Sequence, residues 1–223
     1  METTGSQLPH LLTAFRAGDQ EAGDLLLRHF EPWLRLLARV QVESRFGGRF
    51  DPSDVVQQTL FEAVRAASAF RGTTEAEFAA WLRRILAHVL AHEIRRHGGT
   101  LKRQVNLEIP LDKELTATSG RLGDLVPAGG TSPSQALVKH ERQLLLAQAL
   151  ERLPDDYREV IILRNLEGLS HEEVARRLGR KSGAVRMLWV RALTRLRQEV
   201  LTLCPSLAGG EVCAPGEDHG PTC

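Results

Sequence analysis

The sequence predicts an all-α protein: two small helical domains joined by a flexible linker, the C-terminal one containing a helix-turn-helix. Leu, Ala, Arg and Glu recur at three-to-four spacing through most of the 223 residues, which is the period of an amphipathic helix. The alternation of β-branched residues that marks strands is scarce. Residues 106–133 are rich in Gly, Pro, Ser and Thr without a sustained period, as is typical of a linker. We therefore expect a first domain over residues 1–100, a linker over 101–133, a second domain over 134–202 and a disordered, cysteine-containing tail over 203–223.

Basic charge is concentrated in two separate blocks, although the formal net charge of the whole chain is only +1. Residues 83–103 carry six Arg or Lys against one Glu, and residues 170–199 carry eight against three Glu, which is a local net charge of +5 in each block. Phosphate is the natural counter-charge for such blocks. The sequence therefore predicts two contact surfaces for nucleic acid.

Neither the N-terminus nor the cysteines indicate export. No apolar run approaches the ~20 residues needed to span a membrane, and residues 1–6 lack the basic-then-apolar character of a signal peptide. We therefore expect a cytoplasmic protein without membrane insertion. Cys204, Cys213 and Cys223 all lie in the last stretch without a C-x-x-C pair, so neither a disulfide framework nor a zinc site is indicated. The role of these cysteines stays open.

Residues 170–190 have the pattern of a helix-turn-helix. Ser170 and Glu173 are spaced as a capping box, which starts a helix. Gly179 offers the left-handed conformation at which a helix stops and turns. In the second helix the apolar positions recur at helical spacing and leave an outward face. The apolar positions are Val185, Leu188, Trp189, Ala192 and Leu196, and the outward ones are Arg186, Met187 and Val190.

Residues 51–54, Asp-Pro-Ser-Asp, are a strong helix start, with Asp at the cap, Pro at the first helical position and a carboxylate in the first turn. The stripe expected to be buried in this helix is Val56, Leu60, Ala63, Val64 and Ala67. Asp54, Gln57, Gln58 and Phe61 are left on the other side. An exposed Phe among polar groups favours a docking face for a protein partner.

The helical pattern breaks at residues 71–74, Arg-Gly-Thr-Thr, and resumes over residues 78–96. Arg83 and Arg84 are expected on the outside of this second stretch. Holding an unpaired base outside the DNA stack requires a pocket-forming loop and cations against the backbone, and this segment supplies both.

Taken in order, these motifs resemble those of a bacterial RNA polymerase sigma factor of the extracytoplasmic-function (ECF) type, over residues 8–200. Residues 51–60 resemble the helix with which that family docks on the clamp coiled coil of the largest polymerase subunit. Residues 70–85 resemble the segment that melts and reads the minus-ten promoter element. Residues 153–170 resemble the entry to the domain that reads the minus-thirty-five element.

The resemblance implies a transcription initiation factor, not an enzyme, with core RNA polymerase and promoter DNA as partners. Whether an anti-sigma factor is a further partner stays open. The implied polymerase-binding residues are Asp51, Asp54, Gln57, Gln58 and Phe61. The implied minus-ten residues are Arg71, Gly72, Thr73, Arg83, Arg84 and His88. The implied minus-thirty-five residues are Ser170, Arg180, Lys181, Ser182, Gly183, Arg186, Met187 and Val190, with the helix over residues 182–197 in the major groove.

Two other readings fit parts of the sequence. His88 and His92 lie one helical turn apart beside Glu93, a spacing at which two imidazoles can bind one metal ion, but Val89 stands where the zinc-hydrolase motif has Glu. The second reading is a stand-alone helix-turn-helix regulator with residues 8–97 as a sensor or dimerisation domain. We expect no catalytic residue, metal or cofactor.

Overall fold

The computed structural model describes residues 4–46, 51–97, 108–125 and 135–205, and these residues are almost entirely helical. The elements are α1 (Thr4–Arg16), α2 (Gln20–Phe46), α3 (Pro52–Arg65), the short turn η1 (Ala67–Ala69), α4 (Glu75–His97), α5 (Glu108–Gly123), α6 (Gln135–Glu151), α7 (Asp155–Ile161), the π-helical turn η3 (Ile162–Leu166), α8 (His171–Leu178) and α9 (Ser182–Leu203). No strand occurs in these ranges, so the all-α prediction is confirmed. None of the described helices is both long and apolar enough to cross a membrane.

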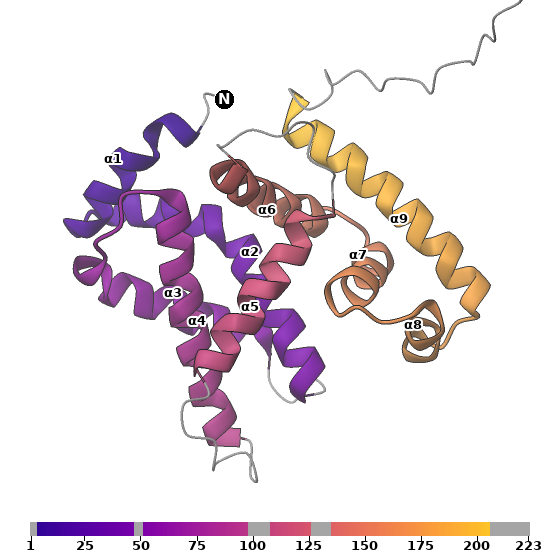
Figure 1. The fold of residues 1–223 in the computed structure, drawn as a ribbon. Helices are drawn as coiled ribbons and strands as arrows, with labels where there is room; N and C mark the ends of the chain where they lie inside the picture. Colours follow the sequence, from indigo (N-terminus) through magenta and orange to yellow (C-terminus); the bar gives the residue numbers. More distant parts are fainter. Residues whose placement is uncertain (1–3, 47–50, 98–107, 126–134, 206–223) are drawn as a thin grey trace, which may run out of the picture.

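Helices α1 to α4 form a first group, which runs from indigo to magenta in Figure 1. The long helix α2 packs against both α1 and α3, and α4 packs against α3. Phe30, Trp33 and Phe78 are fully buried at the centre of this group. Large aromatic side chains bury much apolar area, and edge-to-face contacts such as that of Phe30 with Phe78 fix how neighbouring helices meet.

Helices α6 to α9 form a second group, in which α9 packs against α6, α7 and α8 (Figure 1). Val160 and Ile161 of α7 and Val185 and Leu196 of α9 are buried between these helices. The backbone changes from α-helical to π-helical after α7, where the Glu167 N–H donates to the carbonyl of Ile162 at 3.0 Å. This wider turn leads the chain into the helix-turn-helix.

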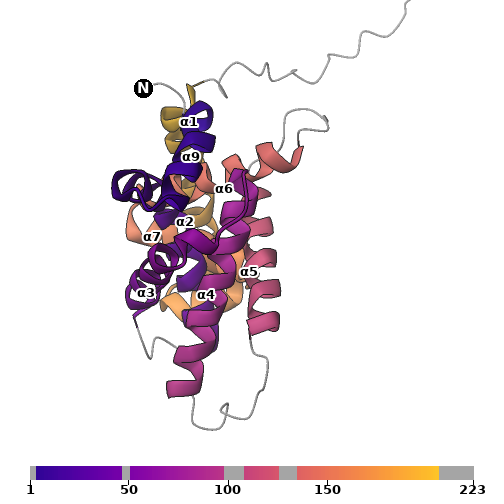
Figure 2. The same ribbon diagram turned by 90° about the vertical axis from the view of Figure 1, so that its left-hand side faces the viewer.

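Helix α5 lies inside the segment predicted to be a flexible linker, and for residues 108–123 that prediction is wrong. Leu111, Leu115 and Leu122 are fully buried, and the Thr, Ser and Gly residues between Leu115 and Leu122 conceal the helical period. These leucines hold α5 against its neighbours α4 and α6. Figure 2 shows α5 running alongside α4. Residues 124 and 125 form a turn after α5. The remaining parts of the predicted linker, residues 101–107 and 126–133, lie outside the described residues.

The two groups also touch directly, because α2 packs against α6. The Arg35 guanidinium of α2 lies 2.6 Å from the Glu151 carboxylate of α6. Arg39, one turn further along α2, is ion-paired with Glu159 of α7. The second group is therefore seated on α2 of the first.

Candidate polymerase and nucleic-acid interfaces

Helix α3 begins as its sequence predicts. The Asp51 carboxylate accepts a hydrogen bond from the Ser53 backbone N–H at 2.8 Å, and Pro52 occupies the first helical position. The Asp54 carboxylate lies in the first turn, where it interacts favourably with the positive end of the helix dipole. The Asp51 side chain therefore caps the helix that carries the candidate polymerase face.

The outer face of α3 carries Asp54, Gln57, Gln58 and Phe61, all exposed as expected from the sequence. The Phe61 ring is 57% exposed, which is uncommon for so large an apolar side chain. Val64, predicted to be buried, is instead 56% exposed, so that prediction is wrong. Val64 lies one turn after Phe61 and therefore widens the apolar part of this face. Reasoning from the sequence did not place Val64 there.

The inner face of α3 explains the error at Val64. The buried residues are Val55, Val56, Thr59 and Ala63, and the Thr59 hydroxyl is satisfied by the Val55 carbonyl at 2.7 Å. The buried arc is therefore centred one residue earlier than the predicted stripe. Its position depends on how α3 meets α2 and α4, which the helical period alone does not determine.

The loop before α4 is held by Glu77. Its carboxylate accepts hydrogen bonds from the backbone N–H groups of Thr73 and Thr74 at 2.9 and 3.0 Å. These bonds lower the pKa of Glu77, the Thr73 bond most strongly. Gly72 is required here because a Cβ at this position would lie 2.8 Å from the Glu77 Cβ and would also collide with the Phe70 ring. Arg71 stays exposed at the loop surface.

The minus-ten candidates on α4 do not share one face. Arg84 and His88 are exposed one turn apart. Arg83 points elsewhere, and its Nε donates to the Asp112 carboxylate of α5 at 3.0 Å. Only 17% of the Arg83 side chain is exposed. The structure therefore brings Arg84 and His88 together and places Arg83 under α5.

A groove of about 680 Å³ separates α3 from α4. Asp54 and Gln58 line it from α3, and His88 and His92 line it from α4. Residues assigned from the sequence to polymerase binding and to minus-ten reading thus meet along one groove.

The geometry of α4 does not support the hypothesis of a metal site at His88 and His92. His92 Nδ1 lies 3.4 Å from the neighbouring Glu93 carboxylate. Within the described ranges, no group of three or more His, Cys, Asp or Glu side chains is arranged to hold a metal ion. Cys204 is half-buried at the end of α9, and Cys213 and Cys223 lie outside the described residues.

The first helix of the helix-turn-helix has the predicted capping box. The Ser170 hydroxyl accepts from the Glu173 N–H at 3.2 Å, and the Glu173 carboxylate accepts from the Ser170 N–H at 2.7 Å. The hydrogen bond from the Ser170 backbone N–H lowers the pKa of the Glu173 carboxylate most, and the Ser170 hydroxyl lowers it further. Gly179 ends α8 in the left-handed conformation, at φ +62°. The hydroxyl of Ser170 is engaged in this cap, so its contribution is to place α8.

The second helix presents the predicted outward face. Arg186, Met187 and Val190 are exposed, whereas Val185 is buried against the rest of the second group. Lys181 and Gly183 are exposed at its start. The spacing of the exposed residues places them on one side of α9, and that side is free for a DNA groove.

Three contacts set the angle of α9, and sequence reasoning missed their partners. The Arg180 guanidinium pairs with Asp156 of α7 at 2.6 Å. The Ser182 hydroxyl donates to Glu172 of α8 at 3.2 Å. The Trp189 Nε1–H donates to the side-chain oxygen of Asn165 in η3 at 2.9 Å. Local periodicity carries no signal for partners so far apart in sequence.

Replacing Gly179 by Ala should lower the free energy of unfolding by about 1–2 kcal/mol, because a Cβ is unfavourable in the left-handed conformation. Gly183→Ala is the matched control, since a Cβ there meets nothing within 4 Å and the backbone is helical. Urea unfolding followed by circular dichroism should show a loss for the first variant and none for the second. Equal losses would contradict a conformational role for Gly179.

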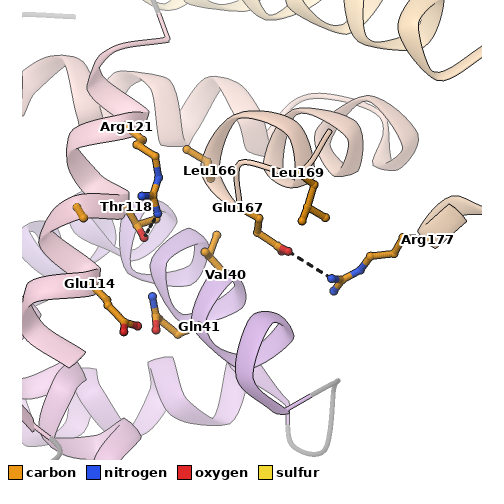
Figure 3. Close-up of a pocket in the computed structure, with 10 residues that line it drawn as sticks. Val40, Gln41, Glu114, Thr118, Arg121, Leu166, Glu167, Leu169 and Arg177 are labelled. Carbon is orange, nitrogen blue, oxygen red and sulfur yellow. Dashed lines mark hydrogen bonds and ion pairs between the residues drawn. The ribbon is translucent and has the colours of Figure 1, made fainter. Parts of the chain in front are cut away.

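A cavity of about 360 Å³ lies where α2, α5, η3 and α8 meet (Figure 3). Its lining is mostly polar, with Arg121 of α5, Glu167 after η3 and Arg177 of α8 around it. The Glu167 carboxylate lies 3.3 Å from the Arg177 guanidinium. Burial raises the pKa of Glu167, and the arginine only partly offsets this effect.

Comparisons with known proteins identify both groups. Residues 26–100 match the family model for sigma-70 region 2, and residues 143–196 match the model for sigma-70 region 4. The first match covers most of α2 to α4, and the second covers the end of α6 through most of α9.

Relatives align along nearly the whole chain. The ECF RNA polymerase sigma-E factors of Salmonella typhimurium and Escherichia coli strain K12 are each 28% identical over 194 residues, which is 86% of this chain and 94% of each relative. The RNA polymerase sigma-H factor of Pseudomonas aeruginosa is 29% identical over 192 residues, which is 85% of this chain and 91% of that protein. The chain therefore belongs to the ECF group of sigma-70 factors, a family of transcription initiation factors.

Proposed function

We propose that this chain binds core RNA polymerase in the cytoplasm and directs it to promoters. In this proposal residues 1–100 read and melt the minus-ten element, and residues 134–202 read the minus-thirty-five element. The observation that carries the proposal is the combination, on one chain, of an exposed face on α3 and a basic helix-turn-helix. The exposed Phe61 and Val64 on α3 support a protein partner there.

The roles within the first domain follow from the exposed chemistry. Asp54, Gln57, Gln58 and Phe61 form the polymerase face, and Asp51 holds the helix that carries them. Arg71, Gly72 and Thr73 form the loop against the melted strand. The exposed Arg84 and His88 of α4 belong to the minus-ten set, with Arg84 directed to the DNA backbone. Arg83, which is paired with Asp112 in this structure, completes the set.

The roles within the second domain follow the helix-turn-helix geometry. Arg186, Met187 and Val190 face base edges in the major groove. Lys181, Ser182 and Gly183 lie at the helix start, where backbone N–H groups favour phosphate. Ser170 and Arg180 hold the two helices at the required angle.

Reconstituted transcription tests the whole proposal. The purified chain should co-purify with core polymerase and give it activity on a subset of genomic promoters. A stand-alone regulator would instead bind double-stranded DNA with unchanged affinity in the absence of core. If core polymerase with the purified chain shows no more promoter-directed transcription than core alone, the proposal is overturned.

Arg186→Ala should relax base preference at one or two positions of the minus-thirty-five element, at a cost of about 1–3 kcal/mol for a lost bidentate contact. Arg197→Ala is the matched control. It removes an exposed charge further along α9 and should weaken binding to all sequences alike. Selection from a randomised upstream element measures both. An unchanged preferred sequence for Arg186→Ala would count against the assigned reading face.

A further inference from the structure

The Arg83 guanidinium is paired with a carboxylate in this structure, whereas the proposed function requires it to contact DNA. Its Nε donates to Asp112 at 3.0 Å, and the side chains of the two residues are only 17% and 32% exposed. The next residue, Arg84, is exposed. A carboxylate and a backbone phosphate are alternative partners for a guanidinium, because both accept charge-assisted hydrogen bonds in the same geometry.

Helix α5 is anchored at its other end as well. The Trp33 Nε1–H of α2 donates to the Ser119 hydroxyl of α5 at 3.1 Å, and that hydroxyl donates to the Gln143 side chain of α6 at 2.7 Å. All three side chains are buried. This chain of bonds ties α5 to both groups, so α5 cannot leave α4 without disturbing the contact between the groups.

In this structure the two groups lie too close together to contact both promoter elements at once. The minus-ten and minus-thirty-five elements are about 25 base pairs apart by their names, or roughly 85 Å of B-DNA at ~3.4 Å per base pair. Here α4 packs directly on α6, and α6 packs on α9. Packed helices lie about 8–10 Å apart, so two such steps separate the axes of α4 and α9 by roughly 20 Å where these helices pack. The two groups must separate before both elements are read.

The interface between the two groups, called the seam below, contains charged and polar side chains. Such an interface can separate. Glu159 pairs with Arg39 across it, yet burial raises the pKa of Glu159 in spite of that arginine. Desolvated ion pairs contribute little net stability. The polar cavity beside Glu167 and Arg177 interrupts the apolar packing of the same seam (Figure 3). A polar interface between domains is the kind that opens.

We infer that α5 is a built-in cover over a DNA-binding face of α4, and that Asp112 occupies Arg83 in place of a backbone phosphate until the cover lifts. The inference rests on the proposed function, because it takes the minus-ten strand as the ligand that replaces Asp112. Contact with core polymerase and promoter then exposes Arg83 only where DNA is to be melted. The free chain is kept from binding single strands elsewhere.

Asp112→Asn tests the cover in the free, full-length chain. The probe is a fluorescein-labelled single-stranded DNA of mixed sequence, about 15 nucleotides long. The variant should bind this probe at least about fivefold more tightly than the wild type, the range of a modest coupling energy. Its plot of log affinity against log salt should steepen by about 0.7, the value of one additional phosphate contact on a single strand.

Three control variants separate this effect from a change in net charge. Asp24→Asn makes the same change at an exposed carboxylate of α2 and should bind like the wild type. Asp112→Glu keeps a carboxylate and should also stay near the wild type. Asp112→Asn combined with Arg83→Gln should lose the gain. If Asp112→Asn binds no more tightly than Asp24→Asn, or if the gain persists without Arg83, the cover is refuted.

Transcription by the wild-type holoenzyme is measured on the same preparations. Its failure would count against the proposed function, whereas the oligonucleotide result bears on the cover alone. Hydrogen exchange over α5 gives a second readout of the cover. The amides of residues 111–123 should be protected in the free chain and lose protection in the promoter complex, and protection retained there would also refute the cover.

Discussion

Replacing Phe78 by Ala should lower the free energy of unfolding by about 3–5 kcal/mol, the range for removing a buried aromatic ring. The Phe78 ring is fully buried and lies 5.1 Å from the ring of Phe30, 5.2 Å from Phe70, and 5.5 Å from both Phe15 and Trp81, between ring centroids. It therefore joins α1, α2, the loop before α4 and α4 itself. Its loss leaves a cavity that all of these elements border.

Phe61→Ala is the matched control for this prediction. The same atoms are removed, but the Phe61 ring is exposed on α3, so stability should change by no more than about 0.5 kcal/mol. Urea unfolding followed by tryptophan fluorescence measures both variants. Similar losses for the two would mean that Phe78 is not the centre of the first domain's core.

Asp54→Lys combined with Gln57→Ala should weaken binding to core polymerase by about 2–5 kcal/mol, because the partner groups on polymerase would be left unpaired and one would face a like charge. Both side chains are exposed on α3, away from the buried arc through Val56 and Ala63. The free energy of unfolding should therefore fall by only about 1 kcal/mol, which is the cost of placing a lysine against the dipole at the start of α3. Competition against the wild-type chain for a limiting amount of core measures the loss.

Asp24→Lys provides the control, since it reverses a charge on an exposed carboxylate of α2 in the same domain. It should compete for core like the wild type. Normal binding of the double variant, or an equal loss in the control, would remove α3 as the polymerase face. Loss of binding together with a loss of unfolding free energy well above about 1 kcal/mol would show damage to the fold and would contradict the assignment of Asp54 and Gln57 as surface groups.

The locally encoded features could be predicted from the sequence. The cap at Asp51, the capping box at Ser170 and Glu173, and the left-handed Gly179 all occur as expected. Each depends on residues within a few positions of one another, whose side chains reach the backbone groups they satisfy whatever the rest of the chain does. The outward face at Arg186 likewise follows from helical spacing alone.

Helix α5 could not be predicted in the same way. Its sequence is interrupted by Thr, Ser and Gly, and its helix propensity is correspondingly weak. Packing of Leu111 and Leu115 against neighbouring helices stabilises it instead. Most helical stability in proteins comes from such tertiary burial, which a composition count over a supposed linker does not register.

The two neighbouring arginines of α4, Arg83 and Arg84, illustrate the difference between what the sequence predicts and what depends on tertiary packing. The amino-acid sequence predicts that Arg83 and Arg84 lie on one helix, with side chains about 100° apart around its axis. The packing of α5 against α4 then leaves Arg84 exposed and pairs Arg83 with Asp112, 29 positions away. Such a long-range ion pair forms only once apolar burial has brought the two helices together, and that burial depends on the whole chain.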